Sequence, residues 1–457
     1  MSEQSERIFD AITGIGGDLI EKAQETRRAR RRARVRWIGP AAAVLAAAIL
    51  IGVLSGKGAV TTYAITEAEY PKVVARGDPG VYSGALDGFL TASIPEFLSG
   101  ADGKNRVYSP LNVYMALSML AELSDGNTRA QILSLLGADN IAAQRERAKA
   151  LWHGNYYTGE RGECLLANSL WLNRDIAFVQ STMETLAKDY YASSYRGEMG
   201  SAGFDRALQS WLNKQTGGLL KEQAGGVRMP ADTVMAIAST IFFKGTWSSE
   251  FNPSATSADV FHAPDGDLTC DYMHGTKPGP YYWGERFSAV RQYFSNNRSM
   301  YFILPDADSS PDALLEDAEF LAFLTGDRID WANQKDLTIR LTVPKFDVVS
   351  DIDLLPGLAA LGVTDALDPA VSDFTPMTKD DALAEAGIYV SQAKHAARVA
   401  VDEEGCVAVA YTVIGMSGGS MPPEETVDFT LDRPFLFVIS GPDGLPLFVG
   451  VVNRPAA

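Results

Sequence analysis

Residues 401–433 have the sequence VDEEGCVAVAYTVIGMSGGSMPPEETVDFTLDR, whose character changes along its length. It begins with the β-branched and small residues that are typical of strands. Its centre, residues 415–423, contains the glycine, serine and proline of a loop. The strongly apolar segment PFLFVIS, residues 434–440, then follows. Two interpretations fit: an ordinary long loop between strands, or a loop that can itself become a strand.

The sequence around this stretch predicts helices early and strands late. Apolar residues recur at helical spacing over 85–98, 110–123, 181–190 and 204–212. The near-continuous apolar run at 234–243 predicts a strand that is buried on both faces. Further strands are predicted over 165–172, 300–304, 337–343, 388–392, 397–401, 427–431, 435–440 and 447–452. This order favours an α+β fold with large, mostly antiparallel sheets.

Composition and charge narrow the function classes. With 457 residues, 46% of them hydrophobic, the chain can bury a large core. The formal net charge is -17, and residues 1–36 carry nine basic against six acidic residues, which leaves 31 basic against 51 acidic elsewhere. Phosphates would be repelled by so acidic a body, so we expect no nucleic-acid partner.

Cysteine and histidine residues do not form a recognisable site. Cys164, Cys270 and Cys406 are far apart and odd in number, which excludes a disulfide framework within the chain. The four histidines are isolated from carboxylates at metal-ligand spacing. We therefore expect neither a metal nor a cofactor.

The N-terminal region predicts a membrane anchor. Residues 37–54, WIGPAAAVLAAAILIGVL, carry no charge and approach the length needed to span a ~30 Å hydrocarbon layer. Seven arginines lie between residues 27 and 36 and should remain cytoplasmic. We therefore expect a basic cytoplasmic tail (1–36), a single-pass signal-anchor helix (37–55), a tether (56–80) and an extracytoplasmic domain (81–455). A cleaved signal peptide, which would leave a secreted protein, is the alternative.

One enzyme motif is present but lacks its context. Residues 415–419, GMSGG, fit the G-x-S-x-G nucleophile elbow with Ser417 as nucleophile. That motif needs a helix immediately after the serine, and the sequence GSMPP cannot start one. His395 also precedes Ser417, which reverses the chain order of that triad. The chain is not expected to be an enzyme, and a serine hydrolase remains a remote alternative.

Short blocks of sequence, in order along the chain, point to a known family. They include NRVYSPL at 105–111, IFFKGTW at 241–247, DRPFLF at 432–437 and LFVG at 447–450. Other blocks are ALSML at 116–120, TRAQI at 128–132, ANSLW at 167–171, VPKF at 343–346, LGV at 361–363 and DEEG at 402–405. Together they cover almost all of residues 81–455 and resemble the serpins, a family of serine protease inhibitors.

The resemblance implies both a fold and a mechanism. The serpin fold has a large central, mostly antiparallel sheet, further sheets, about eight to nine helices and an exposed reactive loop. A protease cleaves the loop, which then inserts into the central sheet as an extra strand and traps the protease covalently. We therefore expect a monomeric suicide-substrate inhibitor, and the anchor suggests a bacterial, membrane-anchored type. A non-inhibitory serpin-fold module that only binds, or only serves as a substrate, is the alternative.

The scissile bond follows by counting along the loop from the hinge glutamate. The family spacing places it at Gly419–Ser420, with Met416–Ser417 and Ser420–Met421 as alternatives. There is no Lys or Arg between Arg398 and Arg433. Trypsin-like targets are therefore disfavoured, and elastase-, subtilisin- or chymotrypsin-like proteases with small or apolar primary specificity are favoured.

The hinge residues meet the demands of insertion. Alternate residues from Cys406 onward should face the packed side of the sheet, and no Pro, Lys, Arg, Asp or Glu occurs over 406–421. Burying an unpaired charge there would cost several kcal/mol, so its absence favours an inhibitor. Cys406 replaces the usual Thr or Ser, and its oxidation would place a polar group at the entry point. The hinge set is Glu403, Gly405, Cys406, Ala408, Ala410 and Thr412.

A second set of residues matches the family's shutter and breach. The shutter is the polar cluster beneath the strands that must part, and Ser109, Asn168 and His395 match it. Ser239 stands where the family usually has Asn, so its reach towards His395 is shortened. Trp247 and Glu403 match the breach, where insertion begins.

Overall fold

The computed structural model describes residues 63–66, 68, 86–159, 162–326, 328–406 and 423–455. The expected tail (1–36), the expected anchor (37–55), hinge residues Ala408, Ala410 and Thr412, and loop residues Met416, Ser417, Gly419, Ser420 and Met421 lie outside this part of the chain. Within it, no helix is long and apolar enough to cross a membrane.

Eleven α-helices lie in the described residues, and four of them have only five or six residues. They are α3 (Asp87–Leu98), α4 (Pro110–Leu123), α5 (Gly126–Leu135), α6 (Ile141–Asn155), α7 (Gln180–Asp189), α8 (Ala202–Gln215), α9 (Lys221–Gly226), α10 (Pro311–Leu315), α11 (Ala318–Thr325), α12 (Leu355–Ala360) and α13 (Asp381–Ala386).

An eight-stranded sheet, here called sheet A, forms one layer of the fold. Its order is β1-β5-β4-β6-β14-β13-β12, with β3 paired to β4, and within the described part of the chain only β4 and β5 of this sheet pair in parallel. Its strands are β1 (Tyr63–Thr66), β3 (Tyr157–Gly159), β4 (Gly162–Asn173), β5 (Ala192–Gly197), β6 (Met235–Thr246), β12 (Phe346–Asp353), β13 (Lys394–Val401) and β14 (Gly405–Cys406). Strand β1 lies within the segment expected to be a tether and forms the edge of sheet A.

A nine-stranded sheet of order β15-β11-β8-β9-β10-β16-β17-β2, with β7 paired to β8, forms the second layer. Among its described strands, only β11 and β15 pair in parallel. Its strands are β2 (Arg106–Tyr108), β7 (Ser257–Ala263), β8 (Gly266–Trp283), β9 (Phe287–Tyr293), β10 (Ser299–Pro305), β11 (Gln334–Pro344), β15 (Thr426–Thr430), β16 (Phe435–Ser440) and β17 (Pro446–Val452). The expected α+β class with large, mostly antiparallel sheets is confirmed.

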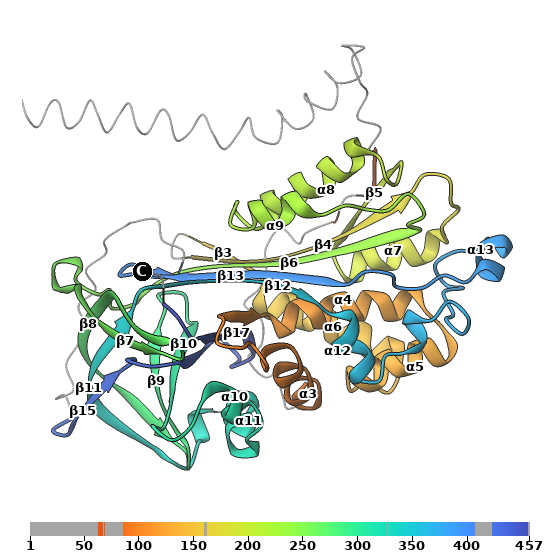
Figure 1. Ribbon diagram of the computed structural model, residues 1–457. Helices are drawn as coiled ribbons and strands as arrows, with labels where there is room; N and C mark the ends of the chain where they lie inside the picture. The colour runs from red at the N-terminus through yellow and green to blue at the C-terminus, as the bar shows by residue number, and fades with distance from the viewer. Residues whose placement is uncertain are drawn as a thin grey trace, which may run out of the picture. The chain divides into compact units, whose positions relative to one another are not determined.

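Helix α4 is the centre of the core. Ser109 caps its first turn, accepting from the Asn112 backbone N–H at 3.4 Å, and Pro110 supplies the preset φ of the first helical position. Twelve of its 14 residues are buried, so α4 is enclosed between layers. It contacts both β6 of sheet A and β17 of the second sheet. Helices α8 and α9 cover the opposite face of sheet A (Figure 1).

One predicted strand is absent. Residues 388–392 form no regular structure, and β13 begins only at Lys394. The Val390 N–H donates to the Ala366 carbonyl at 2.8 Å, and the Ile388 carbonyl accepts from Ser372 Oγ. These hydrogen bonds to a neighbouring loop satisfy the backbone, which removes its need for a strand partner.

Candidate functional site

The candidate hinge begins at a tight turn between β13 and β14. Asp402 Oδ1 accepts hydrogen bonds from the backbone N–H groups of Glu404 and Gly405, at 3.0 and 3.1 Å. The Asp402 N–H donates to the Gly405 carbonyl at 3.0 Å. An aspartate that bonds to the backbone two and three residues ahead closes a turn. The chain therefore leaves sheet A at β13 and re-enters it at once.

Strand β14 lies between two strands of sheet A. Gly405 pairs with Thr246, and Cys406 pairs with Gly245 on one side and Val401 on the other. A side chain at Gly405 would place its Cβ 2.1 Å from the Gly245 carbonyl oxygen, so glycine is required for this approach. Gly405 and Cys406, the residue at which the predicted insertion begins, form an additional strand at one end of the sheet.

Trp247 holds this end of the sheet in place. Its indole Nε1 donates to the Asp402 carbonyl at 3.0 Å, and its backbone N–H donates to the Glu404 carbonyl at 2.9 Å. The buried ring stacks on Phe294 with 4.4 Å between centroids and 9° between planes. The predicted breach residue therefore binds the turn that precedes the loop.

Glu403, the other predicted breach residue, is bound to two distant residues. Its carboxylate accepts from Thr256 Oγ1 at 2.7 Å and lies 3.1 Å from Lys345 Nζ. Burial by itself would raise the pKa of Glu403, but the Thr256 and Lys345 hydrogen bonds and the Lys345 charge lower it overall. The charged carboxylate therefore joins the turn to the Lys345 segment.

Two predicted shutter residues meet on the β13 side of the sheet. The backbone N–H of Ser109 donates to His395 Nε2 at 3.0 Å, and Ser109 Oγ donates to the Leu447 carbonyl at 2.6 Å. His395 is 3% exposed, and burial lowers its pKa to about 4. The imidazole is therefore neutral, with its proton on Nδ1, since Nε2 accepts.

Stability should fall on mild acidification because of His395. Its folded-state pKa of about 4 lies below its ordinary value of 6.5. The unfolded chain therefore takes up a proton first as the pH falls from 6.5 to 4, with a loss of up to about 3 kcal/mol from this group. Thermal unfolding of the wild type and of His395→Gln should be compared between pH 7.5 and 4.5. The variant should lose less stability over that range, and equal pH slopes would contradict this assignment.

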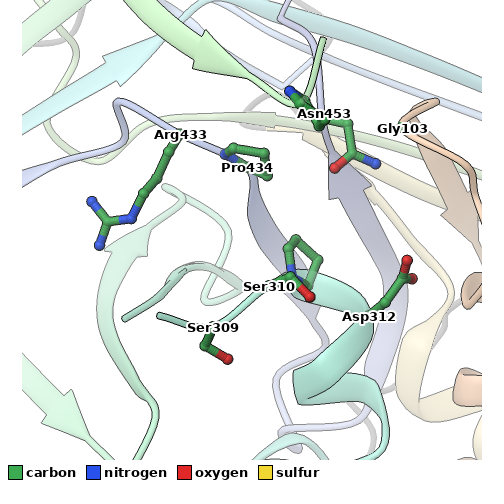
Figure 2. A pocket seen from close by; sticks show the side chains of 9 residues that line it. Gly103, Ser309, Ser310, Asp312, Arg433, Pro434 and Asn453 are labelled. Carbon is green, nitrogen blue, oxygen red and sulfur yellow. The ribbon is translucent and has the colours of Figure 1, made fainter. Parts of the chain in front are cut away.

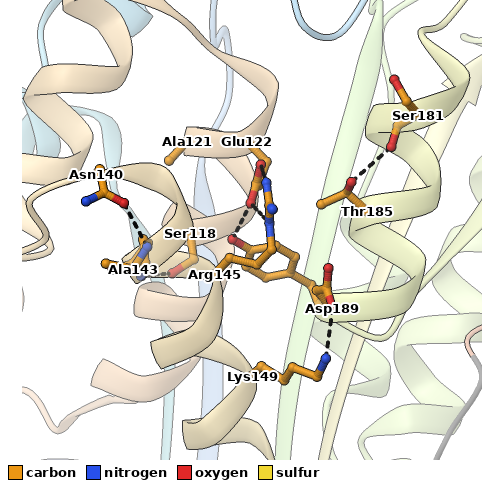
Figure 3. A network of polar contacts seen from close by, with 12 residues as sticks. Ser118, Ala121, Glu122, Asn140, Ala143, Arg145, Lys149, Ser181, Thr185 and Asp189 are labelled. Carbon is orange, nitrogen blue, oxygen red and sulfur yellow. Dashed lines mark hydrogen bonds and ion pairs between the residues drawn. The ribbon is translucent and has the colours of Figure 1, made fainter.

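The other polar set lies on the β6 side of the sheet. Ser239 Oγ donates to Asn168 Oδ1 at 2.8 Å, and Asn168 Nδ2 donates to the Tyr190 carbonyl at 2.7 Å. The Tyr190 hydroxyl donates to Glu122 Oε1 at 2.9 Å. Arg145 binds both oxygens of the buried Glu122 carboxylate, at 2.7 and 2.9 Å (Figure 3). The buried charge is thus paired, and the chain of bonds joins β6 to helices α4 and α6.

The predicted shutter therefore forms two sets rather than one. Among the described residues, Ser239 Oγ bonds to Asn168, whereas His395 Nε2 bonds to Ser109. The sequence showed that Ser239 has a shorter reach than Asn, and its hydroxyl finds a partner on the adjacent strand β4. Both sets also reach helix α4, one through its N-cap Ser109 and the other through Glu122, and Ser239 Oγ lies 3.5 Å from the Asn112 carbonyl oxygen of that helix.

A small cavity separates β6 from β13 next to β14. Its volume is about 20 Å³, which is room for about one water molecule. It is lined by Thr216, Leu219, Leu220, Ile241, Phe242, Phe243, Ala397, Arg398 and Phe448. In the described residues β6 and β13 pair with β14 and not with each other. A strand that continued from Cys406 would enter at this point.

Cys406 is buried within β14. Burial raises the pKa of its thiol, with the Asp402 charge acting in the same direction. The thiol is therefore protonated and poorly reactive. The oxidation considered from the sequence requires this end of the sheet to open first.

Four residues of the site were not predicted from the sequence. Thr256 and Lys345 bind Glu403 from 147 and 58 residues away, although Lys345 lies within the VPKF block. Arg398 and Asp347 form an ion pair on neighbouring strands, with Arg398 Nε and Asp347 Oδ1 at 2.9 Å. The only sequence signal for this pair is a single arginine in the apolar strand KHAARVAV.

A larger cavity lies away from the hinge. It has a volume of about 250 Å³ and is lined mainly by residues around the start of α10, just before β16 and just after β17 (Figure 2). Its lining includes Ser310, Arg433 and Asn453. None of the predicted hinge, shutter or breach residues lines it.

Comparison with known proteins identifies the family. The family described as Serpin (serine protease inhibitor) matches residues 89–455, so the chain belongs to the serpins. Plasminogen activator inhibitor 1 of Sus scrofa is 27% identical over an alignment of 388 positions that covers 79% of this chain and 89% of that protein. Serpin-ZX of Arabidopsis thaliana is 28% identical over an alignment of 380 positions that covers 78% of this chain and 93% of that protein.

A solved structure shows the same fold. The native state of the thermophilic serpin tengpin superposes with a TM-score of 0.73 at 22% identity, covering 86% of this chain and 99% of that one. The serpin fold expected from the sequence is confirmed.

Proposed function

We propose that this serpin inhibits serine proteases by trapping them after its reactive loop is cleaved. The observation that carries the proposal is β14, because Gly405 and Cys406 occupy the first positions of an additional strand between β6 and β13. Cys406 pairs with the buried residue Val401, which supports an inward position for every second residue after it. Those residues are the uncharged Ala408, Ala410 and Thr412.

The chemistry uses the catalytic groups of the protease. The protease serine Oγ attacks the carbonyl carbon of Gly419, and the bond to the Ser420 nitrogen breaks. The serine proton passes through the protease histidine to the new Ser420 amine. The remaining ester joins the protease to Gly419. Insertion of the loop then carries the protease away from its active geometry before water can hydrolyse this ester.

The proposed targets have small or apolar primary specificity. Gly419 is the proposed residue before the cleaved bond, with Met416 and Ser420 as alternatives, and none of them carries a charge. A trypsin-like pocket gains its binding energy from a basic side chain. Elastase-, subtilisin- and chymotrypsin-like proteases therefore fit the loop better.

The full chain in detergent should be mixed with elastase-like, subtilisin-like, chymotrypsin-like and trypsin-like proteases and analysed on a denaturing gel. A band near the summed mass is expected with the first three, and sequencing of the released fragment should begin at Ser420. Cleavage without such a band, and without a rise in thermal stability of the cleaved chain, would leave only a substrate module. Turnover of ester substrates that Ser417→Ala abolishes would favour the hydrolase alternative.

We also propose that residues 37–55 anchor the domain to a bacterial cytoplasmic membrane, with the domain outside the cytoplasm. The uncharged run at 37–54 and the arginines before it support this location. In fractionated cells the full chain should sediment with membranes, resist extraction by carbonate and be accessible to external protease. Recovery in the soluble fraction with residue 37 intact would overturn the anchor, whereas a new N-terminus after residue 55 would indicate cleavage and secretion.

A further inference from the structure

Arg398 links β13 to the turn between helices α8 and α9. Its Nε and one terminal nitrogen bind the two oxygens of Asp347 on β12, at 2.9 and 2.5 Å. Its other terminal nitrogen donates to the Leu219 carbonyl at 3.1 Å. The bidentate pair fixes the plane of the guanidinium, so the donor to Leu219 is held in position.

The α8–α9 turn packs on β6, which lies across the gap in sheet A from Arg398 on β13. Gly217 lies on the ring of Phe242, which belongs to β6; a Cβ on this glycine would be 3.0 Å from that ring. Helix α8 contacts β4 and β6, and Phe204 and Trp211 of α8 share a buried cluster with Trp171 of β4. The turn therefore moves with β6, whereas Arg398 moves with β13.

The hydrogen bond from Arg398 to Leu219 crosses the place where the sheet must open. Both residues line the small cavity between β6 and β13. One additional strand widens a sheet by about 4.8 Å. A 3.1 Å hydrogen bond across that gap cannot persist unless the turn or the guanidinium moves. The Asp347 pair lies within the β12–β13 side and is unaffected by opening.

We propose that Arg398 is a positioning residue that holds the α8–α9 turn over the entry slot and slows entry of the loop strand into sheet A. The proposal rests on the proposed function, since it concerns the same loop and slot. Among the described residues, neither shutter set joins β6 directly to β13 by a hydrogen bond, whereas the Arg398 bond to Leu219 runs from β13 to the turn that packs on β6. Breaking that bond therefore contributes to the barrier for insertion.

The test measures uptake of a separate strand, which needs no protease. A synthetic peptide with the sequence of residues 407–419 is incubated with the full chain in detergent, and the complex is followed by native mass spectrometry. Arg398→Met keeps an apolar stem but removes the donors, and it should take up peptide about tenfold faster, as expected for one lost charge-assisted hydrogen bond. Arg398→Lys keeps one donor and should give an intermediate rate.

Arg129→Met is the matched control. Arg129 also binds a carboxylate, Asp125 at 3.0 Å, and a backbone carbonyl, Ala121 at 3.1 Å, but within the α4–α5 segment. It should take up peptide at the wild-type rate. An unchanged rate for Arg398→Met, or an equal acceleration by Arg129→Met, would overturn the role of Arg398.

Protease trapping by the same variants separates the two proposals. If the wild type takes up peptide but traps no protease, the proposed function fails and the peptide rates still decide the role of Arg398. If the wild type traps protease but binds no peptide, a larger trapped fraction for Arg398→Met supports the role and an unchanged fraction overturns it. If the wild type does neither, both proposals are wrong.

Discussion

Ala410→Arg should convert the proposed inhibitor into a substrate. Side chains alternate between the two faces of a strand, so in the inserted strand residue 410 should point into the core on the same face as the buried Cys406. A guanidinium at position 410 would therefore have to enter the core without a partner. An unpaired buried charge costs about 3–5 kcal/mol, and each 1.4 kcal/mol is a factor of ten. Insertion should then lose to hydrolysis of the ester. A denaturing gel should show cleaved chain in place of the covalent band, with the cleavage rate preserved.

Val409→Arg is the control for that change. In the inserted strand, residue 409 should point to the face opposite to that of residue 410. Arg398 of β13 already carries a guanidinium on that face. It adds the same charge to the loop, so both variants should be cleaved alike, but Val409→Arg should keep more of the covalent band. Equal trapping by the wild type and Ala410→Arg would show that the loop does not insert in this register.

Trp247→Ala should destabilise the domain by about 3–5 kcal/mol, the usual cost of removing a large buried aromatic side chain. The ring is 2% exposed and stacks on Phe294, and its Nε1 is the donor to the Asp402 carbonyl. The free energy of unfolding measured in urea should fall, and the loss should be greatest for probes near β14.

Trp283→Ala provides the comparison for that variant. Trp283 is 38% exposed on β8 and lies in the second sheet. Its replacement should cost much less than that of Trp247. A small loss at Trp247, or equal losses at the two positions, would mean that the tryptophan does not hold the turn.

Strands with a continuous apolar run could be predicted from the sequence because burial alone specifies them. Strand β6 and the pair β16 and β17 are of this kind, and α4 is specified equally well by its apolar spacing. Strand β8 was not predicted, because its 18 residues include Gly275, Pro278, Gly279 and Pro280. It forms through a long antiparallel pairing with β11, an interaction between distant segments that local sequence does not contain.

In the site, too, features set by neighbouring residues could be predicted from the sequence, whereas contacts between distant segments could not. The turn at Asp402 and the small residues of β14 could be anticipated because their chemistry is local. The partners of Glu403 could not, since Thr256 and Lys345 reach it from separate strands. The bond from Arg398 to Leu219 depends on where α8 ends relative to β13, which only the folded chain specifies.

The position of β1 shows on which side of sheet A the N-terminal part of the chain enters the sheet. Strand β1 pairs with β5 at the edge of the sheet and continues through β4 to β6. The chain that precedes it therefore joins the sheet on the β6 side of β14. If a membrane holds that preceding segment, the strands on the β6 side are attached to the membrane. Strands β12 and β13 and the entering strand then move relative to them during insertion. The displacement produced by insertion would then occur away from the point of attachment.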